Sequence, residues 1–364
     1  MALFPNDLLF TLAAAAFGTA AAVVALERLA GAMRLIDHPG EHRNHERPVP
    51  LVGGLAIFAG LLLAFAVSGK PALAFLAPAL LLVVVGAIDD AFKLHAGPRL
   101  AAQAFAASLM ILLGHVELRT VGDLLGNGPI GLWIFVFPMT VFATVGVINS
   151  TNMVDGMDGL TGSVAAIAFV WYAAAAGLQG LGGAFAIAAT LAAAVAAFLY
   201  FNQRLPHRAR ARVFLGDAGS TLIGFGLAWL AIDLTQGEGR TFPPICALWV
   251  VLLPLADCVS LMARRIAAGR SPFSADRRHI HHYLRARGLS HAQTLAALTA
   301  ASAAFGAVGF FGWRLGVPQD VLFWTFFFFY FAYHFWIQRA WKAVERPAHA
   351  SSMVPASTEQ EEAV

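Results

Sequence analysis

The amino-acid sequence predicts an all-α fold, that of a polytopic integral membrane protein with about eleven transmembrane helices. Of the 364 residues, 59% are hydrophobic and only 12% are charged, and the mean hydropathy is +0.70. The hydrophobic residues gather in runs of about 17–25 residues, the length that crosses a bilayer. The basic residues concentrate in alternate loops. These observations exclude an ordinary soluble domain.

Eleven apolar runs follow one another, although Gly and Pro interrupt the third, fifth and eighth. The first follows an N-terminus without basic residues, so we expect a retained helix rather than a cleaved signal. The ninth contains Cys246 and Cys258, which a helix holds about 18 Å apart, too far for a disulfide. No long-period repeat is visible, which disfavours an inverted-repeat transporter. The runs are centred near Ala20, Gly60, Leu80, Ala107, Phe142, Ile167, Leu191, Leu227, Val251, Ala303 and Phe327.

The lysines and arginines predict the orientation of the chain. Taken loop by loop, 20 of them fall on one side of the membrane and 4 on the other. Because basic loops stay in the cytoplasm, we expect the N-terminus outside and the C-terminus cytoplasmic. We expect one transmembrane domain with cytoplasmic active-site loops over residues 1–340 and a polar, disordered cytoplasmic tail over 341–364. The lipid bilayer is an expected partner, and no nucleic acid is.

Every acidic, Gly-rich or His-rich cluster falls on the predicted cytoplasmic side. Asp89 and Asp90 end the third run, whereas a lone Asp257 within the ninth receives no role. The other clusters are "RNHERPVPLVGG" (43–54) before the second run, "NSTNMVDGMDGL" (149–160) after the fifth, "VFLGDAGS" (213–220) before the eighth and "SPFSADRRHIHHYL" (271–284) after the ninth.

These residue types together indicate a metal and phosphate site. Carboxylates at a helical mouth can hold Mg²⁺, which in proteins takes one or two carboxylates plus substrate phosphates. Asp155 and Asp158 would face the same side if their segment is helical. "GDAGS" before a helix offers backbone N–H groups to an anion, and the nearby Arg and His side chains add phosphate donors. The set predicts a nucleotide or pyrophosphate substrate handled at the cytoplasmic membrane surface.

Each cluster also has a simpler explanation. Asp89 and Asp90 could mark a solvated helix end, Asp155 and Asp158 could cap a helix, and "GDAGS" alone is more often an N-cap than a site. The histidines of "HIHH" could bind zinc, as in an intramembrane metallohydrolase. A secondary transporter would also carry intramembrane Asp residues, but it predicts charges at the bilayer midplane rather than at helix ends.

The clusters carry a resemblance to a known family. "DDAFKLHAGPRLAAQ" (89–103), "NSTNMVDGMDGL", "VFLGDAGSTLIGF" (213–225) and "SPFSADRRHIHHYL" occur in order between the expected helices. Over residues 10–340 the chain resembles the polyprenyl-phosphate N-acetylhexosamine-1-phosphate transferase family, which includes the MraY, TagO and WecA enzymes. "PLVGG" and the interrupted triplet "HIHH" favour the WecA-type branch, the undecaprenyl-phosphate GlcNAc-1-phosphate transferases. The MraY branch usually has three adjacent His followed by an acidic residue.

The resemblance implies a Mg²⁺-dependent phosphotransferase, with Mn²⁺ as the alternative ion, in the bacterial inner membrane with a cytoplasmic active site. It would transfer GlcNAc-1-phosphate from UDP-GlcNAc to undecaprenyl phosphate and release UMP. The product would initiate a cell-envelope glycan, as in lipopolysaccharide (O-antigen), common-antigen or teichoic-acid synthesis. UDP-MurNAc-pentapeptide or another UDP-N-acetylhexosamine stays an alternative donor. Homodimers occur in the family, although the sequence shows no interface.

The resemblance also implies roles for single residues. Asp217 and Asp90 would bind the metal, and Asp89 and Asp90 would position metal and nucleophile, with direct attack favoured over a covalent aspartyl intermediate. A phosphate monoester has a second pKa of about 6, so the lipid phosphate is mostly dianionic at neutral pH and needs no strong base. The residues expected to contact the nucleotide sugar are Asn149, Asn152, Asp155, Asp158, Asn202, Arg270, His279, His281 and His282.

Overall fold

The computed structural model describes residues 5–38, 47–70, 72–272 and 278–350. Within these ranges the chain is mostly α-helical, with one antiparallel pair of two-residue strands, so the all-α prediction is confirmed. The first elements are α1 (Pro5–Leu29), β1 (Ile36–Asp37), β2 (Val49–Pro50), α2 (Gly53–Val67), α3 (Leu73–Phe92), α4 (Ala96–Gly114), η1 (Trp133–Phe135) and α5 (Val136–Val154). They are followed by α6 (Leu160–Leu178), α7 (Gly182–Asn202), α8 (Gly216–Asp233), α9 (Pro244–Val250), α10 (Leu252–Ala267), α11 (Ile280–Ala286), α12 (His291–Arg314) and α13 (Gln319–Ala350).

The helices lie where the apolar runs predict them. Ten of the eleven predicted centres fall inside a helix, and the eleventh, Val251, lies at a break where α9 and α10 meet at 81°. Among the described residues, eight helices are long and apolar enough to span a membrane, or nine if the bent pair is one span. The shorter α2 has 15 residues. The number of eleven spans and the sides of the termini therefore stay predictions.

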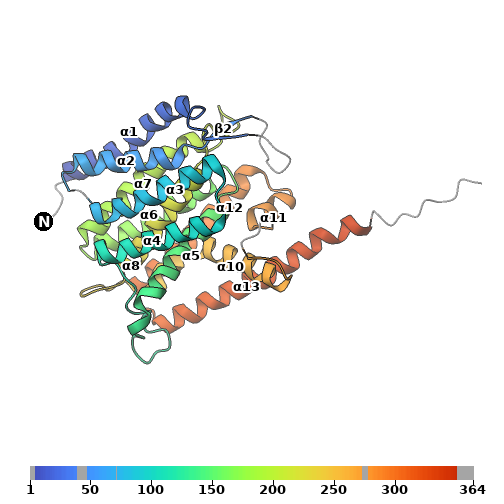
Figure 1. Ribbon diagram of the computed structural model, residues 1–364. Helices are drawn as coiled ribbons and strands as arrows, with labels where there is room; N and C mark the ends of the chain where they lie inside the picture. Colours follow the sequence, from blue (N-terminus) through green and yellow to red (C-terminus); the bar gives the residue numbers. More distant parts are fainter. Residues whose placement is uncertain (1–4, 39–46, 71, 273–277, 351–364) are drawn as a thin grey trace, which may run out of the picture.

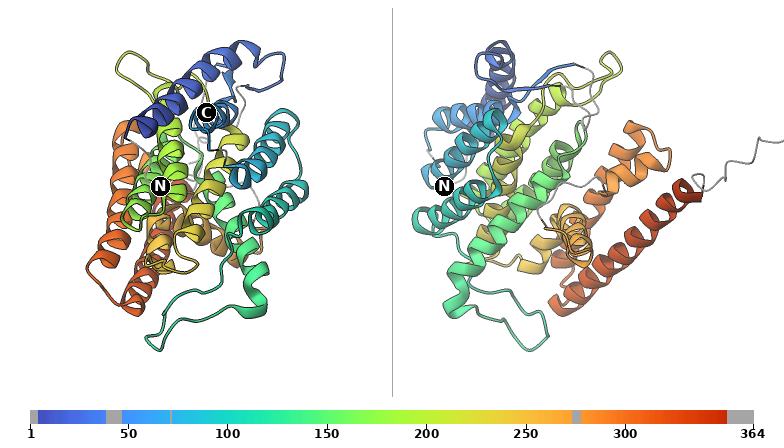
Figure 2. Two further views of the ribbon diagram at one scale, coloured as in Figure 1. Left: turned by 90° about the vertical axis from the view of Figure 1, so that its left-hand side faces the viewer. Right: turned by 45° about the vertical axis from the view of Figure 1, so that its right-hand side comes forward.

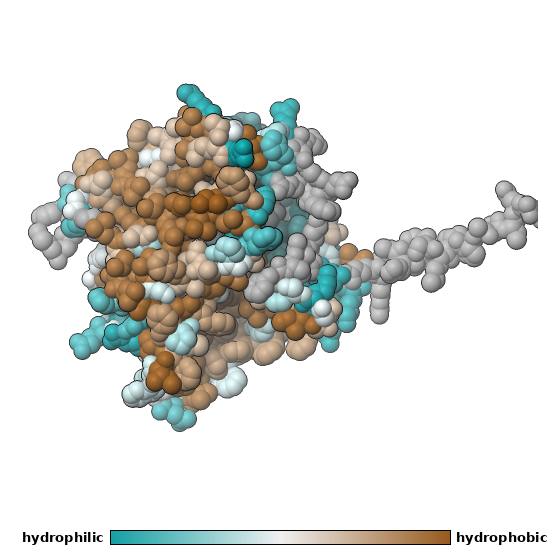
Figure 3. Space-filling model, in the orientation of Figure 1, coloured by the Kyte–Doolittle hydropathy of each residue, from teal (hydrophilic) through white to brown (hydrophobic). Residues whose placement is uncertain are grey.

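The surface of the bundle is suited to lipid. Figure 3 shows a broad apolar surface across the face that carries α2, α3 and α4, with hydrophilic residues gathered along its margins. Large apolar side chains on these helices are exposed, among them Leu62, Leu80, Val84, Phe105 and Leu112. So much exposed apolar area is rare on a soluble monomer. The chain is a multi-pass membrane protein.

The helices form a bundle with one helix set apart. α1 packs along α2, α6 packs along α7, and α12 covers α6 and α9. The long α13 contacts α9, α10 and α11 along one side, and its C-terminal end projects beyond the bundle (Figure 1, Figure 2). α13 continues through residue 350, so the first part of the predicted tail is helical; residues 351–364 lie outside the described residues.

α8 occupies the centre of the bundle. Fifteen of its 18 residues are buried, and it packs against α3, α5 and α2. Its sequence is apolar around most of its circumference after the first turn, as expected of a helix enclosed by protein. Phe75 of α3 stacks on Phe225 with 5.6 Å between ring centroids and meets Trp229 edge-on at 5.4 Å. The rest of the bundle is therefore arranged around α8.

The first turn of α8 touches the last turns of α3 almost backbone to backbone. A Cβ atom added at Gly86 would lie 2.4 Å from the Cα atom of Ala218. Small residues at a helix crossing permit such an approach, which is frequent in membrane proteins. Because Asp89 and Asp90 follow Gly86 within one turn and Asp217 precedes Ala218, this contact brings the three aspartates together.

Backbone hydrogen bonds join the segments that precede α2 and α8. The N–H of Phe214 donates to the carbonyl of Pro50 at 2.8 Å, and the N–H of Gly53 donates to the carbonyl of Phe214 at 3.0 Å. Pro50 belongs to β2, which pairs with β1. Two clusters far apart in the sequence, "PLVGG" and "VFLGDAGS", are thereby fixed side by side beneath the start of α8.

We predict that Gly86→Ala destabilises the protein, because the new methyl group forces α3 away from α8. Overpacking of this kind costs about 1–3 kcal/mol. Thermal unfolding of the purified protein in detergent measures the effect as a lower midpoint. The matched control is Gly146→Ala on α5, where an added Cβ meets no heavy atom within 4 Å. Equal midpoints for the two variants would contradict the close packing.

Candidate active site

Asp90 caps the N-terminus of α8. Its Oδ1 accepts the N–H of Asp217 at 2.9 Å and its Oδ2 accepts the N–H of Ala218 at 3.2 Å. A helix N-terminus favours a negative charge, and here the protein supplies that charge itself. The "GDAGS" segment was predicted to offer these N–H groups to a bound anion. The second and third of them, those of Asp217 and Ala218, are instead occupied by the carboxylate at the end of α3.

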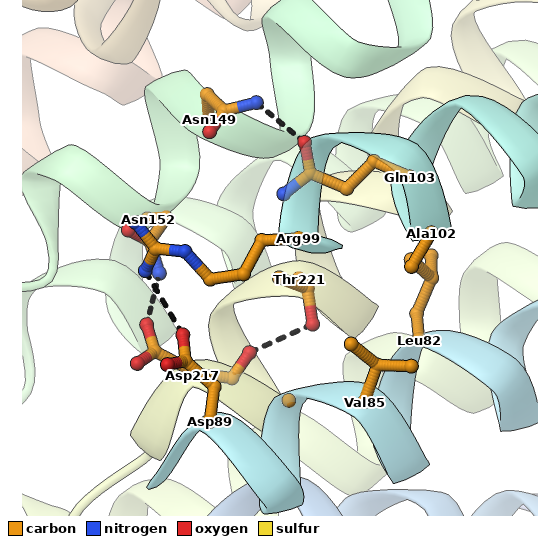
Figure 4. Close-up of a pocket in the computed structure, with 11 residues that line it drawn as sticks. Leu82, Val85, Asp89, Arg99, Ala102, Gln103, Asn149, Asn152, Asp217 and Thr221 are labelled. Carbon is orange, nitrogen blue, oxygen red and sulfur yellow. Dashed lines mark hydrogen bonds and ion pairs between the residues drawn. The ribbon is translucent and has the colours of Figure 1, made fainter. Parts of the chain in front are cut away.

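Asp89 faces the other way and meets Asp217. Asp89 is 3% exposed; its Oδ1 accepts the N–H of Leu94 at 2.7 Å, and its Oδ2 forms an ion pair with Arg99 at 2.9 Å. The carboxyl groups of Asp89 and Asp217 lie within direct interaction range of each other. Figure 4 shows them side by side beneath the Arg99 guanidinium. Two carboxylates in one sheltered site repel each other, so the pair favours a cation between them.

Asn152 holds the Asp217 side chain in place. Its Nδ2 donates to Oδ1 of Asp217 at 2.6 Å and to Oγ of Ser220 at 2.8 Å. Asn149, one turn earlier on α5, donates instead to Oε1 of Gln103 at 2.6 Å. Both asparagines face the same cavity, but only Asn152 contacts a carboxylate (Figure 4).

The donor set was tested for its fit to a metal ion. Among the described residues, no three His, Cys, Asp or Glu side chains converge as metal ligands would. Asp89 and Asp217 alone provide two facing carboxylates. That number suits Mg²⁺, which completes its coordination with water and substrate phosphates. It does not suit the catalytic zinc site of a metallohydrolase, which takes three protein ligands, and the described histidines form no such cluster.

The cavity beside the carboxylates has a polar side and an apolar side. Asp89, Arg99 and Asp217 lie on the polar side, and Leu82, Val85 and Ala102 line the opposite side (Figure 4). The further lining residues are Gly86, Gln103, Asn149, Asn152 and Thr221. Such a cavity is suited to an amphipathic ligand with a charged end and a hydrocarbon end.

Asp155 and Asp158 do not share a helical face, because α5 ends at Val154 and α6 starts at Leu160. We expected these two side chains to face the same side only if their segment is helical, and it is not. Asp158 forms an ion pair with Arg204 at 2.8 Å. Asp155 is exposed and lies within electrostatic range of Asp217. Asp155 therefore borders the carboxylate site, whereas Asp158 is tied to the loop after α7.

Asn202 fastens two loops together instead of facing the cavity. Its Oδ1 accepts the N–H of Gly159 at 2.8 Å, and its Nδ2 donates to the carbonyl of Val213 at 2.9 Å. Its side chain is buried, and both its amide oxygen and its amide nitrogen are hydrogen-bonded. In this structure Asn202 is a brace between the "DGMDGL" loop and the approach to α8.

The histidines lie against the same loop. His281 is 2% exposed, and a Cβ added at Gly156 would lie 2.6 Å from its Nε2 atom. His281 stacks on His279 with centroids 5.5 Å apart and contacts His282 at 4.2 Å. Burial, together with His282 and His279, lowers the pKa of His281 to about 3, so this ring is neutral at physiological pH. Within the part of the chain that the structure describes, neither of its nitrogens has a hydrogen-bond partner.

Arg270 is exposed in the segment that follows α10. Its backbone N–H donates to the carbonyl of Arg265 at 2.8 Å. Its contact with a substrate stays a prediction, and residues 273–277 of the "SPFSADRRHIHHYL" cluster lie outside the described residues.

Several residues of the site were not singled out from the sequence. Arg99 was counted only as a loop cation, although it pairs with Asp89 across the α3–α4 turn. Gln103, one turn further on α4, bonds to Asn149. Their spacing of four residues on a helix that starts directly after the Asp pair is a signal that could have found them. Asp257, which received no role, hydrogen-bonds to His279.

The fold and the site define the class of this protein. A buried carboxylate pair, an arginine and an apolar wall meet at the end of membrane-spanning helices. This is an integral membrane protein whose cavity combines paired charged side chains with an apolar wall.

Comparison with known proteins identifies the family. Residues 72–235, which include the aspartates and the arginine of the site, match the family described as glycosyl transferase family 4. Three similar proteins are each named undecaprenyl-phosphate alpha-N-acetylglucosaminyl 1-phosphate transferase. The protein of Yersinia pestis is 36% identical over 312 residues, with 85% of each chain covered. That of Escherichia coli K12 is 34% identical, with 86% of this chain and 87% of the relative covered. That of Haemophilus influenzae is 33% identical, with 88% and 91% covered. The chain belongs to this family of transferases, as the sequence motifs predicted.

We predict that Asn202→Ala loosens the "DGMDGL" loop, because it leaves the buried N–H of Gly159 and carbonyl of Val213 unpaired. Each unpaired buried group costs about 1–3 kcal/mol. Thermal unfolding should show the loss, and limited proteolysis should show faster cleavage between α5 and α6. Gln203→Ala is the matched control, because that amide donates to the Ser163 hydroxyl and bonds to neither of these two loops among the described residues. A loss no greater than that of the control would contradict the bracing role.

Proposed function

We propose that this protein transfers GlcNAc-1-phosphate from UDP-GlcNAc to undecaprenyl phosphate, with release of UMP. The product is a lipid-pyrophosphate-linked sugar that starts a cell-envelope glycan. The observation that carries the proposal is the Asp89–Asp217 pair, which lies under Arg99 beside an apolar wall. The names of the relatives support the same acceptor and the same transferred group. We propose the bacterial inner membrane as the location, with the site on the cytoplasmic face where nucleotide sugars occur.

We propose that Mg²⁺, or Mn²⁺ in its place, binds at Asp217 with Asp89 as the second carboxylate. Asp89 faces Asp217 and is therefore favoured over Asp90 as the second metal ligand. Both oxygens of Asp90 already accept N–H groups of α8. A divalent ion at this position would neutralise charge on the pyrophosphate and on the leaving UMP. Asn152 orients Asp217 for this task through its 2.6 Å hydrogen bond.

The residues of the cavity can position the acceptor. Arg99 presents guanidinium N–H groups beside the carboxylates, where a phosphate monoester would accept them. Leu82, Val85 and Ala102 would contact the first part of the prenyl chain. The lipid phosphate is mostly dianionic at neutral pH. Its oxygen can therefore attack the β-phosphorus directly: a new P–O bond forms, the bond to the α-phosphate oxygen breaks, and UMP carries that electron pair away.

The donor side would lie toward the "DGMDGL" loop and the histidines. Asp155 borders the carboxylate site and His281 lies against Gly156, so a nucleotide sugar that contacts both would place its pyrophosphate near Asp217. A neutral His281 can donate one hydrogen bond and accept another, which suits a sugar hydroxyl or a phosphate oxygen. In this arrangement the acceptor enters from the apolar wall and the donor from the loop side.

The direct test is a transfer assay with purified protein. Radiolabelled UDP-GlcNAc, undecaprenyl phosphate and Mg²⁺ should yield a labelled lipid and an equal amount of UMP, and chelation of the ion should stop both. The same assay with UDP-GalNAc and UDP-MurNAc-pentapeptide tests the choice of sugar. Absence of both products with every donor would refute the proposed function.

We predict that Asp217→Asn lowers kcat at least about 100-fold while the protein stays folded, because a direct metal ligand is lost; even outer-shell residues cost about 10- to 100-fold. The measurements are the transfer assay and thermal unfolding in detergent. The matched control is Asp233→Asn at the other end of α8, where the carboxylate only pairs with Arg240. Full activity of Asp217→Asn would contradict the metal assignment.

We predict that Asp89→Asn changes the Mg²⁺ dependence of activity, whereas Asp90→Asn changes the thermal stability. Asp89→Asn should raise the Mg²⁺ concentration needed for half-maximal activity, because a ligand is lost. Asp90→Asn should chiefly lower the thermal midpoint, because an amide NH₂ then faces one of the two N–H groups of α8. Titration of activity with Mg²⁺ and thermal unfolding separate the two effects. The reverse pattern would identify Asp90 as the ligand.

A further inference from the structure

We infer that Asp257 is a positioning residue that orients His279 for the donor side of the site. The inference rests on the proposed function, since it concerns the same reaction. It assigns a task to a carboxylate of α10 that touches no part of the cavity described above. The neighbouring helix α13 supplies a second residue, Tyr333, to the same arrangement.

Asp257 is a buried carboxylate whose oxygens are all in use. It is 1% exposed. Its Oδ2 lies 2.7 Å from Nδ1 of His279, and its Oδ1 accepts the backbone N–H of Ile280 at 3.2 Å and the hydroxyl of Tyr333 at 2.5 Å. Burial of a carboxylate among apolar helices is costly unless it is hydrogen-bonded and paired. All three partners lie outside α10, so the carboxylate is placed to hold other elements.

These bonds determine which nitrogen of His279 a ligand can use. Nδ1 is committed to Asp257, so Nε2 is the nitrogen that remains. A carboxylate behind one nitrogen sets the tautomer and orientation of an imidazole. The bond to the N–H of Ile280 fixes the backbone directly after His279 as well. Both the ring and its point of attachment are thus held by one side chain.

The orientation is passed on to the loop beside the carboxylate site. The rings of His279 and His281 are stacked with an angle of only 9° between their planes. His281 in turn lies against Gly156, next to Asp155. A rotation of the His279 ring would therefore disturb the stack that borders the loop. Asp257 cannot itself touch a ligand on this geometry, because it lies behind His279.

Tyr333 joins α13 to the arrangement of Asp257 and His279. Most of α13 is left uncovered by the rest of the bundle, and particular side chains hold it, for example Leu322 and Phe326 at Trp249. The Tyr333 hydroxyl donates to Asp257, and Trp336 meets Tyr283 edge-on with 5.3 Å between ring centroids. These two contacts join α13 to the histidine segment. One carboxylate thereby joins α10, the start of α11 and α13.

The test is the steady-state kinetics of Asp257→Asn in the full-length protein. Oδ1 of residue 257 receives two donors, so the amide nitrogen of Asn would face Nδ1 of His279 and impose the other tautomer. We expect kcat/KM for UDP-GlcNAc to fall about 10- to 100-fold, as when the partner behind a functional histidine is removed. The KM for undecaprenyl phosphate should not change. Wild-type values for both substrates would overturn the inference.

A double-mutant cycle with His279→Ala separates positioning from a merely structural effect. If Asp257 acts through His279, Asp257→Asn should cause no further loss of kcat/KM in the His279→Ala protein. Losses that multiply would overturn the inference. Tyr333→Phe covers the case in which Asp257→Asn does not fold, because it keeps the Asp257–His279 bond and removes one donor. It should give a smaller loss of kcat/KM for UDP-GlcNAc that also vanishes in the His279→Ala background.

The same measurements distinguish this inference from the proposed function. If the wild-type protein forms no labelled lipid, the proposed function fails. If the wild-type protein is active and both Asp257→Asn and Tyr333→Phe match it, only the positioning role fails.

Discussion

The hydrogen bonds from the first turn of α8 to Asp90 are the interaction on which the site depends. A helix that begins inside an apolar bundle presents N–H groups that neither water nor lipid can satisfy. The Asp90 carboxylate satisfies two of them from α3. Because Asp217 lies in that same turn, the cap also determines where Asp217 stands. The adjacent Asp89 then has to point to the other side, toward Asp217, so two neighbouring aspartates have different tasks.

The other contacts of the site reinforce this placement from separate helices. Gly86 permits α3 to come close enough for the cap, Asn152 of α5 holds the Asp217 side chain, and Asn202 of α7 holds the loop that approaches α8. The first two interactions cross between elements that are distant in sequence, and the third joins α7 to the loop that follows it. A carboxylate pair that repels itself without a cation can persist only if the backbone around it is fixed in this way. The rigidity of the α8 start is therefore a condition for binding a metal there.

Much of this arrangement follows from the sequence, and the remainder has identifiable physical reasons. The apolar runs located the helices, and the polar clusters located the site, because both depend on local composition. The division of labour between Asp89 and Asp90 could not be predicted, since it depends on which way α3 is rotated against α8. Asp155 and Asp158 would share a face only if their segment were helical. The structure has a loop there, because α5 ends just before it. The bend at Val251 likewise has no signal in hydropathy alone.

Asp257 shows that the role of a single charged residue in an apolar helix can be assigned only when its hydrogen-bond partners are known. The hydropathy of the segment indicates that burying this carboxylate is costly. Its three partners are His279, which caps α11, Ile280 at the start of α11, and Tyr333 of α13. No spacing rule connects these residues with α10. The carboxylate pair and the histidine stack consequently rest on different supports. The pair is held by α3, α5 and α8, whereas the stack is held by α10 and α13. The pair and the stack both border the loop of Asp155 and Gly156. α10 packs directly on α5, so the supports of the stack and of the pair are joined by helix packing. A nucleotide sugar that contacts both groups would lie across the loop between them, which Asn202 braces.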